Sequence, residues 1–377
     1  MSTLEYTMSN PQVPVPHHIL IIGAGVFGLS TTLALLSNPT YNSTKITIVD
    51  GSSSLPNPTG SSVDASRIIR PDYAQQHYSR LALEAQEYWR DTKKEAWGGE
   101  GRYHEPGFVL SVDKDRGDYD YLKDSLANVR RFAAEDDKGR ADLNKIQELD
   151  GPDEIRKATG YEGATGDYGY ANFNSGWADA EACVAYALKR VWNKGGDRVK
   201  IRSGAKVQSL LFSGTECSGV LLVGGEDINA DLTILAAGAW SPTLINLQGR
   251  CLATGQAMAY VDITEEEQKA MENRPTIMNL SRGMFIIPPR GKELKIARHG
   301  FGYRNLVKIP RKGLEGGLPN GCLDSPESEF VQVSVPKVET PIPVEAQETY
   351  RKALRELLPQ MANRPFTRTR ICWYCDT

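Results

Sequence analysis

A glycine-rich stretch near the N-terminus constrains the fold of this chain more than any other feature. Residues 19–22 (ILII) form a short apolar run, which is typical of a parallel strand buried on both faces. Gly23, Gly25 and Gly28 follow in the pattern G-x-G-x-x-G, and apolar residues at helical spacing continue to Leu36. In this pattern the first glycine allows a tight turn, the second lets a pyrophosphate approach the backbone, and the third packs helix on strand. The stretch therefore predicts a strand, a turn and a helix that bind a dinucleotide.

The residues that follow agree with a dinucleotide site. Residues 45–49 (KITIV) predict a second strand, and Asp50 stands at its end, about 20 residues beyond Gly28. A carboxylate at this position binds both ribose hydroxyls and disfavours a 2′-phosphate, so the expected cofactor is FAD or NAD. The alternative is a glycine turn without a ligand, because a chain with 35 glycines produces chance matches.

Length and composition limit the other possibilities. A chain of 377 residues with 40% hydrophobic residues is larger than one core usually supports, which predicts two domains. The net charge of −3 gives no general attraction to nucleic acid or to an anionic membrane, so we expect small molecules as partners. No apolar stretch is long enough to span a membrane, and residues 1–16 are polar and contain proline, which predicts a disordered N-terminus and a cytoplasmic protein.

Periodicity and turn residues predict the remaining elements. Helical spacing of apolar residues predicts helices over 75–97, 119–134, 180–194 and 344–358, and Thr264 with Glu267 forms a capping box that opens a short helix. Strands are predicted at 108–112, 206–212, 219–223, 232–236, 284–289, 294–300, 331–338 and 368–374. The strand at 232–236 ends in a glycine, Gly238, which again permits close approach of a ligand. The fold class is therefore α/β, with a mostly parallel sheet and a second, largely antiparallel sheet.

A pair of arginines carries a local concentration of charge. Arg67 and Arg70 are three residues apart and share a face if their segment is helical. On the residues alone, they are interpreted as surface arginines that pair with Asp64 and Asp72.

The six cysteines are scattered, which predicts free thiols rather than a disulfide scaffold. Cys372 and Cys375 have C-x-x-C spacing, but no second pair completes a zinc site and no βαβ unit follows for a thioredoxin-like motif.

Five stretches carry a resemblance to a known family: GAGVFG, SSVDASRIIRPDYA, LAAGAWSP, LKIARHG and RICWYCDT. They resemble the flavoproteins monomeric sarcosine oxidase, pipecolate oxidase and the fungal fructosyl amino acid oxidases (amadoriases), over residues 19–377. TGQAMAYVDITEEE and GMFIIPP are more similar to fungal members. The resemblance implies a monomer that binds FAD, oxidises a secondary amine of an amino acid to an imine, and passes the electrons to oxygen to give hydrogen peroxide. It also implies a discontinuous Rossmann-type FAD-binding domain (17–75, 170–245 and 366–377) and a substrate domain (76–169 and 246–365).

The resemblance also implies roles for charged residues. Arg70 matches the arginine that binds the substrate carboxylate, and Arg67 matches the arginine beneath the flavin. Lys295 matches the lysine that activates oxygen, where a fixed positive charge stabilises the developing superoxide anion. His299 has the position of an active-site histidine. Without the resemblance, Lys295 is interpreted as a solvated side chain and His299 as a packing or surface residue.

Cys372 falls where the family's cysteine forms a thioether with the flavin, and Tyr374 matches an aromatic residue that borders the substrate. Flavinylation needs a thiolate, so we expect cationic side chains beside Cys372, with Arg368 and Arg370 as candidates. The other expected cofactor contacts are Gly23, Gly25, Val26, Phe27, Gly28, Asp50, Ser66, Val207, Gly238 and Trp240.

Two departures from the family pattern affect the expected activity. Family members continue beyond the matching cysteine with a strand, a glycine-rich loop and a lysine over the flavin, whereas this sequence ends at Thr377 without a peroxisomal tripeptide. We therefore expect weak FAD binding and slow turnover; the alternatives are a shortened member with little or no activity and an NAD-dependent dehydrogenase.

Val63 replaces an active-site histidine of bacterial sarcosine oxidases, which argues against sarcosine itself. A fructosyl, sarcosine-like, pipecolate-like or saccharopine-like substrate, or an intermediate of fungal secondary metabolism, fits the resemblance.

Overall fold

The computed structural model describes residues 14–247, 250–310, 314 and 329–376, so most of the predicted disordered segment 1–16 lies outside the described residues. The chain groups into two compact units. The first unit comprises Met1–Leu55 and Ala187–Ala237, and the second comprises Pro56–Tyr186 and Gly238–Thr377. The predicted boundaries of the FAD-binding domain refer to cofactor contacts and stay a prediction.

The first unit is built on a parallel sheet with the strand order β13-β1-β2-β9. Its strands are β1 (His18–Ile22), β2 (Lys45–Val49), β9 (Val199–Arg202) and β13 (Leu232–Leu235). Ile19, in the central strand β1, pairs with Ile46 on one side and Leu232 on the other. The side chains of β1 from Ile19 onward are almost completely buried, as the apolar run predicts.

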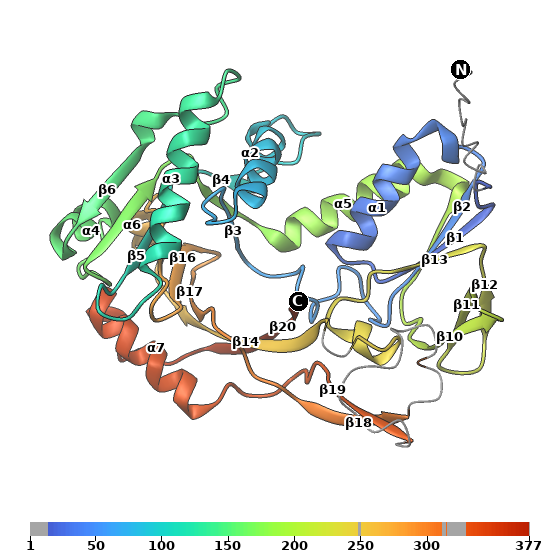
Figure 1. Cartoon of the computed structure of the whole chain (residues 1–377). Helices are drawn as coiled ribbons and strands as arrows, with labels where there is room; N and C mark the ends of the chain where they lie inside the picture. The colour runs from blue at the N-terminus through green and yellow to red at the C-terminus, as the bar shows by residue number, and fades with distance from the viewer. Residues whose placement is uncertain (1–13, 248–249, 311–313, 315–328, 377) are drawn as a thin grey trace, which may run out of the picture. The chain divides into compact units, whose positions relative to one another are not determined.

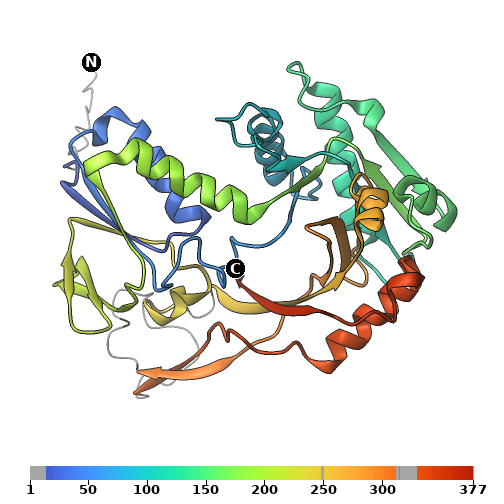
Figure 2. The same ribbon diagram turned by 180° about the vertical axis from the view of Figure 1, so that it is seen from behind.

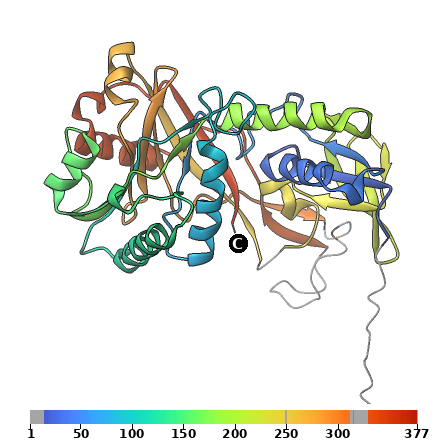
Figure 3. The same ribbon diagram turned by 90° about the horizontal axis from the view of Figure 1, so that it is seen from above.

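Helices cover this sheet. Helix α1 (Val26–Ser37) follows β1, and the end of helix α5 (Ala180–Gly195) packs beside it, where Lys194 Nζ donates to Ser37 Oγ at 2.8 Å (Figures 1 and 3). A small antiparallel sheet of β10 (Val207–Ser213), β11 (Glu216–Leu222) and β12 (Asp227–Asn229) completes the unit. The sequence pattern did not predict β9 and β12, because both are only three or four residues long and alternate without a buried apolar run.

The second unit is built on an eight-stranded sheet with the order β20-β14-β17-β16-β15-β5-β7-β6. Its neighbouring strands pair antiparallel except β15 and β5. The strands are β5 (Phe108–Val112), β6 (Ile146–Asp150), β7 (Tyr168–Asn172), β14 (Leu252–Asp262), β15 (Thr276–Asn279), β16 (Met284–Arg290), β17 (Glu293–Arg298) and β20 (Arg368–Asp376). The prediction of a second, largely antiparallel sheet is confirmed.

The two faces of this sheet are covered differently (Figure 2). Helix α7 (Val344–Leu357) packs through Tyr350 and Leu354 on one face, against residues such as Ala259 of β14 and Ile296 of β17. Helix α3 (Tyr119–Glu135) packs on the other face, where it contacts β5, β6 and β7. The apolar cluster of α3 does not extend to β14, β17 and β20, which leaves that end of the same face for other contacts.

Shorter elements surround this framework. They are α2 (Gln76–Arg90), α4 (Pro152–Thr159), α6 (Glu265–Met271), β3 (Arg67–Ile69), β4 (Tyr103–His104), β8 (Gly176–Ala178), β18 (Leu306–Pro310) and β19 (Phe330–Ser334). The predicted capping box is confirmed at α6, where Thr264 and Glu267 exchange their two hydrogen bonds.

Helix α2 differs from its prediction. It ends at Arg90 rather than near residue 97, because Asp91 takes an extended conformation with φ −70° and ψ 104°. Its buried residues are Ser79, Leu83 and Gln86, whereas the predicted apolar face is largely exposed. Polar contacts orient the helix instead: Gln86 Nε2 donates to Asn174 O at 2.6 Å.

Two kinds of feature are absent from the described residues. Each helix there is too short or too polar to cross a lipid bilayer. The same residues contain no group of three or more His, Cys, Asp or Glu side chains placed to bind a metal ion.

Candidate active site

The glycine loop of the first unit is closed by main-chain contacts. Gly23 has a φ of +108°, and a Cβ atom added there would lie 2.4 Å from Ala236 O. A Cβ atom on Gly28 would lie 1.9 Å from Gly23 O, because the start of α1 rests directly on the turn. Neither position accepts a side chain without a shift of the backbone. The tight turn and the close helix packing predicted for these two glycines are present.

Asp50 ties this loop to the end of β2. Its carboxylate accepts hydrogen bonds from Ala24 N–H and Ser52 N–H, each at 2.9 Å. These bonds hold the carboxylate at the carboxyl end of β2, the edge at which open α/β sheets bind ligands. Gly25 is the N-cap of α1, and no side chain of the described residues caps that terminus. The loop, the helix dipole and the carboxylate together fit the pyrophosphate and ribose of a dinucleotide.

The other predicted cofactor contacts are divided between the units. Val26 and Phe27 begin α1, and the Phe27 side chain is 76% exposed. Val207 begins β10 of the first unit. Gly238 and Trp240 belong to the second unit, in the 3-10 helix Gly238–Thr243.

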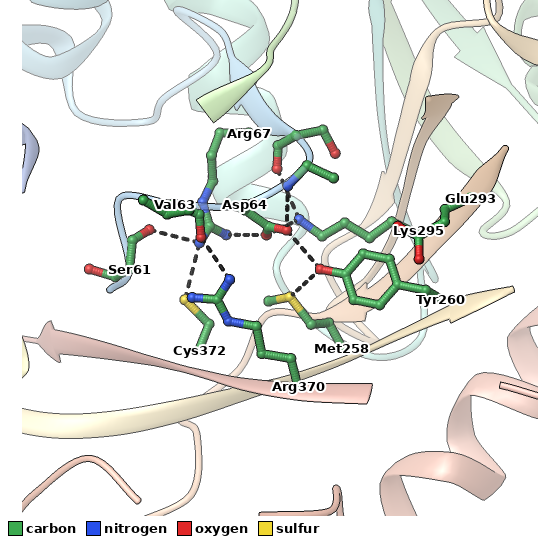
Figure 4. A network of polar contacts seen from close by, with 12 residues as sticks. Ser61, Val63, Asp64, Arg67, Met258, Tyr260, Glu293, Lys295, Arg370 and Cys372 are labelled. Atoms are coloured by element: carbon green, nitrogen blue, oxygen red, sulfur yellow. Dashed lines mark hydrogen bonds and ion pairs between the residues drawn. The ribbon is translucent and has the colours of Figure 1, made fainter. Parts of the chain in front are cut away.

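A buried carboxylate, Asp64, organises the polar contacts of the second unit (Figure 4). Lys295 Nζ donates to Asp64 Oδ2 at 2.5 Å and to Ser66 O at 2.9 Å. Tyr260 OH donates to Asp64 Oδ1 at 2.7 Å, and Arg67 Nη1 lies 3.2 Å from Oδ2. The Asp64 side chain is fully buried and the Lys295 side chain is 3% exposed, so solvent screens this ion pair little.

Arg67 connects this carboxylate to a thiol and a phenol. Its Nη2 donates to Cys372 Sγ at 3.1 Å and to Ser61 O at 2.8 Å. Its Nη1 donates to Tyr374 OH at 3.1 Å. Cys372 is completely buried. One guanidinium therefore brings Asp64, Cys372 and Tyr374 into a single group of contacts.

Strand alternation places these side chains on one face of the sheet. Successive residues of a strand point to opposite faces, so the even-numbered residues of 368–374 share a face of β20. Arg368 of β20 pairs with Tyr260 of β14, and Tyr260 pairs in turn with Lys295 of β17. These residues lie on the face opposite to α7, at the end that the α3 cluster leaves uncovered. Asp64 and Arg67 reach this face from the segment that precedes α2.

Burial and charge shift the pKa values of the pair in different ways. Burial by itself would raise the pKa of Asp64, but the charges of Lys295 and Arg67 and the bonds from Lys295 and Tyr260 lower it to about 2. Burial lowers the pKa of Lys295 to about 8, because Asp64 offsets only part of the lost hydration and Arg67 repels the ammonium. The carboxylate has several donors and remains ionised, whereas the ammonium is close to its titration point at neutral pH.

The cation beside Cys372 differs from the two expected ones. Arg370 donates to main-chain oxygens of segment 60–63, and Arg368 forms an ion pair with a carboxylate of β17. Arg67 is the guanidinium in contact with the thiol. The prediction of a cationic side chain beside Cys372 is correct, but the predicted arginines lie in the same strand as Cys372. A contact between residues 305 positions apart leaves no local signal in the sequence.

Arg70 is held between aromatic rings. Its Cζ lies 4.5 Å from the ring centre of Tyr73 and 5.1 Å from that of Phe108. Its Nη1 is buried and has no hydrogen-bond partner in the part of the chain that the structure describes. The Asp72 carboxylate accepts from Ser175 and Asn172, at 2.7 and 3.1 Å. The interpretation of Arg67 and Arg70 as surface residues is therefore wrong, because both take part in buried contacts. The predicted pairing of Arg67 with Asp64 is present.

His299 and Tyr374 complete the predicted set. His299 follows β17 and is exposed, and its main-chain N–H donates to Gly283 O at 2.7 Å. Partial loss of hydration and then the charge of Arg70 lower the pKa of His299. Burial raises the pKa of Tyr374 to about 12 against the opposing charge of Arg67. Arg70 is therefore close enough to act on His299, while Tyr374 contacts Arg67.

Sequence reasoning missed Tyr260 and the central position of Asp64. Tyr260 lies in the stretch TGQAMAYVD, which was not predicted as a strand; alternation there would have placed Tyr260 on the same face as Met258. Asp64 was considered only as a surface partner of Arg67. A signal was present for Tyr260, a hydroxylated residue within the apolar run AMAYV, whereas Asp64 lies in the polar stretch SSVDASR, which offers none.

Comparisons with known proteins agree with this geometry. Residues 18–377 match the family described as FAD dependent oxidoreductase. The amino acid oxidase imqH of Aspergillus flavus is 32% identical, over 97% of this chain and 84% of that protein. The L-saccharopine oxidase of Schizosaccharomyces pombe is 27% identical, over 95% of this chain and 80% of that protein. The crystal structure of fructosamine oxidase (Amadoriase II) from Aspergillus fumigatus has a TM-score of 0.75 and 26% identity, over 97% of this chain and 76% of that chain.

These matches confirm the resemblance and the predicted fold class. They extend over both units and include the parallel sheet with its glycine loop as well as the large antiparallel sheet. Of the two cofactors that the glycine motif allowed, the family description names FAD. The chain therefore belongs to the family of FAD-dependent oxidoreductases.

Proposed function

We propose that this enzyme oxidises the C–N bond of an N-substituted amino acid to an imine, with dioxygen as the final electron acceptor and hydrogen peroxide as the second product. The observation that carries the proposal is Arg70, whose buried Nη1 has no hydrogen-bond partner among the described residues. A buried guanidinium donor without an acceptor is costly, and a ligand carboxylate would satisfy it. Family membership supplies the redox chemistry.

Arg70 binds the substrate carboxylate in this proposal. The rings of Tyr73 and Phe108 restrict the guanidinium, so little rotational freedom is lost when the carboxylate binds. A charge-assisted hydrogen bond of this kind contributes about 1.5–3 kcal/mol. Oriented binding brings the amine to a fixed place, and a neutral amine needs no strong protein base for hydride loss.

The cofactor FAD, when bound, supplies a two-electron acceptor. Gly23, Gly25, Gly28 and Asp50 hold its pyrophosphate and ribose, and we propose that Cys372 holds the ring by a thioether. The contact of Arg67 Nη2 with Cys372 Sγ at 3.1 Å supports this role, because a guanidinium next to a thiol stabilises the thiolate that the bond requires.

Lys295 provides positive charge for the reaction with oxygen. Reduction of dioxygen creates negative charge, which a fixed cation in a dry site stabilises. The contacts of Lys295 with Asp64 and Ser66 keep its ammonium in one position. Its lowered pKa, about 8, also lets it hold or release a proton near neutral pH.

The substrate class is inferred from the relatives and from the buried Nη1 of Arg70, which has no hydrogen-bond partner among the described residues. Two of the similar proteins are a fructosamine oxidase and an L-saccharopine oxidase, and saccharopine is an amino acid with a secondary amine. We therefore place the substrate among fructosyl, pipecolate-like, sarcosine-like and saccharopine-like amino acids. A monomeric state remains a prediction from the resemblance, and a cytoplasmic location remains a prediction from the sequence.

The test combines a spectrum with a substrate panel. The purified chain should show flavin absorbance, and N-substituted amino acids should yield hydrogen peroxide in a coupled peroxidase assay. Arg70→Met should raise KM by roughly 10- to 150-fold, which corresponds to the loss of one charge-assisted bond. The matched control is Arg80→Met, since exposed Arg80 also contacts an aromatic ring, that of Phe132.

Two results would contradict the proposal. The first is a flavin-loaded protein that forms no peroxide with any N-substituted amino acid. The second is an equal effect of Arg70→Met on substrates with a carboxylate and on amine analogues without one, because Arg70 would then act on the fold rather than on the carboxylate.

A further inference from the structure

Cys375 and Cys251 have no role in the proposed reaction, yet their thiols meet. Cys375 lies near the end of β20, and Cys251 immediately precedes β14, which pairs with β20. Their Sγ atoms are 3.2 Å apart, and both side chains are half-buried. Cys372 points to the opposite face of β20, because residues three apart in a strand alternate. The C-x-x-C spacing therefore does not mark the pair that the fold brings together.

We propose that Cys251 and Cys375 form a peroxide-oxidisable dithiol, which closes to a disulfide and joins the end of β20 to the start of β14. A disulfide requires the sulfur atoms to move from 3.2 Å to about 2.05 Å, a change that small side-chain rotations supply. The strand register already places the two residues diagonally across neighbouring strands, since Ala253 pairs with Cys375 and Leu252 with Asp376.

The reaction balances with one molecule of hydrogen peroxide. The thiolate of Cys251 attacks a peroxide oxygen, so an S–O bond forms, the O–O bond breaks, and the departing hydroxide becomes water with the thiol proton. The sulfur of Cys375 then attacks the sulfenic sulfur, an S–S bond forms, and the S–O bond breaks to release a second water. Two thiols are oxidised by two electrons, and one peroxide is reduced to two waters.

The environment assigns different roles to the two thiols. Burial, and then the hydrogen bond to Cys251, raise the pKa of Cys375 to about 12, which disfavours its thiolate. Cys375 is thus poorly suited to attack peroxide first, but it is in contact with the sulfur that it has to attack second. We expect oxidation over minutes to hours with added peroxide, rather than at the rate of a dedicated peroxidase.

The experiment maps thiols in the full chain. The flavin-loaded protein is treated with graded hydrogen peroxide, quenched with catalase and alkylated, and its peptides are analysed without reduction. We expect a peptide that links Cys251 to Cys375, a parallel loss of both thiols, and their recovery with dithiothreitol. Cys183 is the matched control, because burial also raises its pKa to about 12 but its bond is to a main-chain oxygen.

A variant separates a dithiol from two independent thiols. In Cys251→Ser, Cys375 should remain alkylatable at peroxide doses that remove it in the wild type. Loss of Cys375 at the wild-type dose in this variant would overturn the proposal. A link from either cysteine to Cys322 or Cys372, or sulfinic acid on one thiol with the other still free, would overturn it in the wild type even if the variant does not fold. Because the peroxide is added, the result does not depend on the proposed amine oxidation.

Discussion

Replacement of Asp64 by asparagine tests the electrostatics of Lys295, because it removes the negative charge and keeps the size of the side chain. Asp64 Oδ2 lies 2.5 Å from Lys295 Nζ in a nearly dry site. Burial lowers the pKa of Lys295 from 10.5 to about 8 even while the carboxylate is present. A neighbouring opposite charge shifts a pKa by roughly 1–3 units, so we expect Lys295 in Asp64→Asn to titrate near roughly pH 5–7.

The sign of the pH dependence follows from this pKa. The ammonium carries the positive charge below its pKa, so in the wild type the reaction of the reduced enzyme with oxygen should slow as pH rises through about 8. In Asp64→Asn the same decline should occur through roughly pH 5–7. Near pH 7.5 the variant should therefore react roughly 3- to 240-fold more slowly than the wild type, according to where its pKa falls in this range, and the two rates should converge in acid.

The same shift has a consequence for stability. The unfolded chain binds one more proton than the folded chain between about pH 8 and pH 10.5, so the free energy of unfolding rises with pH across this window. The lowered pKa corresponds to about 3 kcal/mol, a cost of burial that is fully present below pH 8. For Asp64 the free energy of unfolding also rises with pH, but the contribution is stabilising: the lowered pKa of Asp64 stabilises the fold above pH 3.8, and this stabilisation is lost as pH falls through about 2.

The assay is stopped-flow reoxidation of photoreduced enzyme over a pH series, which needs no substrate. Asp72→Asn is the matched control, since Asp72 is also fully buried on the segment before α2 but bonds to Ser175 and Asn172. Its pH decline should stay near 8. A decline in Asp64→Asn that stays near pH 8, or moves to higher pH, would refute the assignment of Asp64 as the partner that sets the charge of Lys295.

Three further substitutions test the site. Cys372→Ser should release all flavin into the supernatant on acid precipitation, whereas Cys375→Ser should retain it; a yellow Cys372→Ser pellet would place the attachment elsewhere. Lys295→Met should leave anaerobic reduction by substrate nearly unchanged and slow reoxidation by roughly 100-fold, since the lost charge costs about 3 kcal/mol; equal slowing of both half-reactions would indicate a structural role. Gly28→Ala should lower Tm and prevent FAD binding, because the added Cβ would lie 1.9 Å from Gly23 O. Gly51→Ala is the control and should be tolerated, because its Cβ would lie 3.5 Å from the nearest atom. Normal FAD content in Gly28→Ala would contradict the loop geometry.

Local features of the fold could be predicted from the sequence. The strand, glycine turn and helix at the N-terminus depend on neighbouring residues, and so does the capping box at Thr264. Alternation in β20 placed Cys372 and Tyr374 on one face. Helix α2 was less predictable, because buried polar groups such as Gln86 orient it and its apolar residues are exposed.

The contacts between distant segments could not be predicted from periodicity. Lys295 meets Asp64 across 231 residues, and the register of three strands decides which side chains of β14 and β17 face them. The resemblance to known flavoproteins named Lys295, Arg67 and Cys372 as site residues, but not the ion pair of Lys295 with Asp64 or the contact of Arg67 with Cys372. Such pairs depend on tertiary packing, which leaves no pattern in either segment alone.

The separation between Arg67 and Cys372 also determines when their contact can form. The bond between Ala24 and Asp50 closes a loop of 26 residues, whereas the bond between Arg67 and Cys372 spans 305. Long loops close at higher entropic cost and later in folding, so we expect the glycine loop to form before the thiol contact. Cys372 becomes fully buried only when β20 docks on β14, and its protection from alkylation during refolding would time this last step. Protection of Cys372 before the amides of β1 resist hydrogen exchange would reverse this order. If the glycine loop does form first, covalent attachment of the flavin through Cys372 would occur only in fully folded molecules, because a partly folded chain has not yet brought Cys372 into the site.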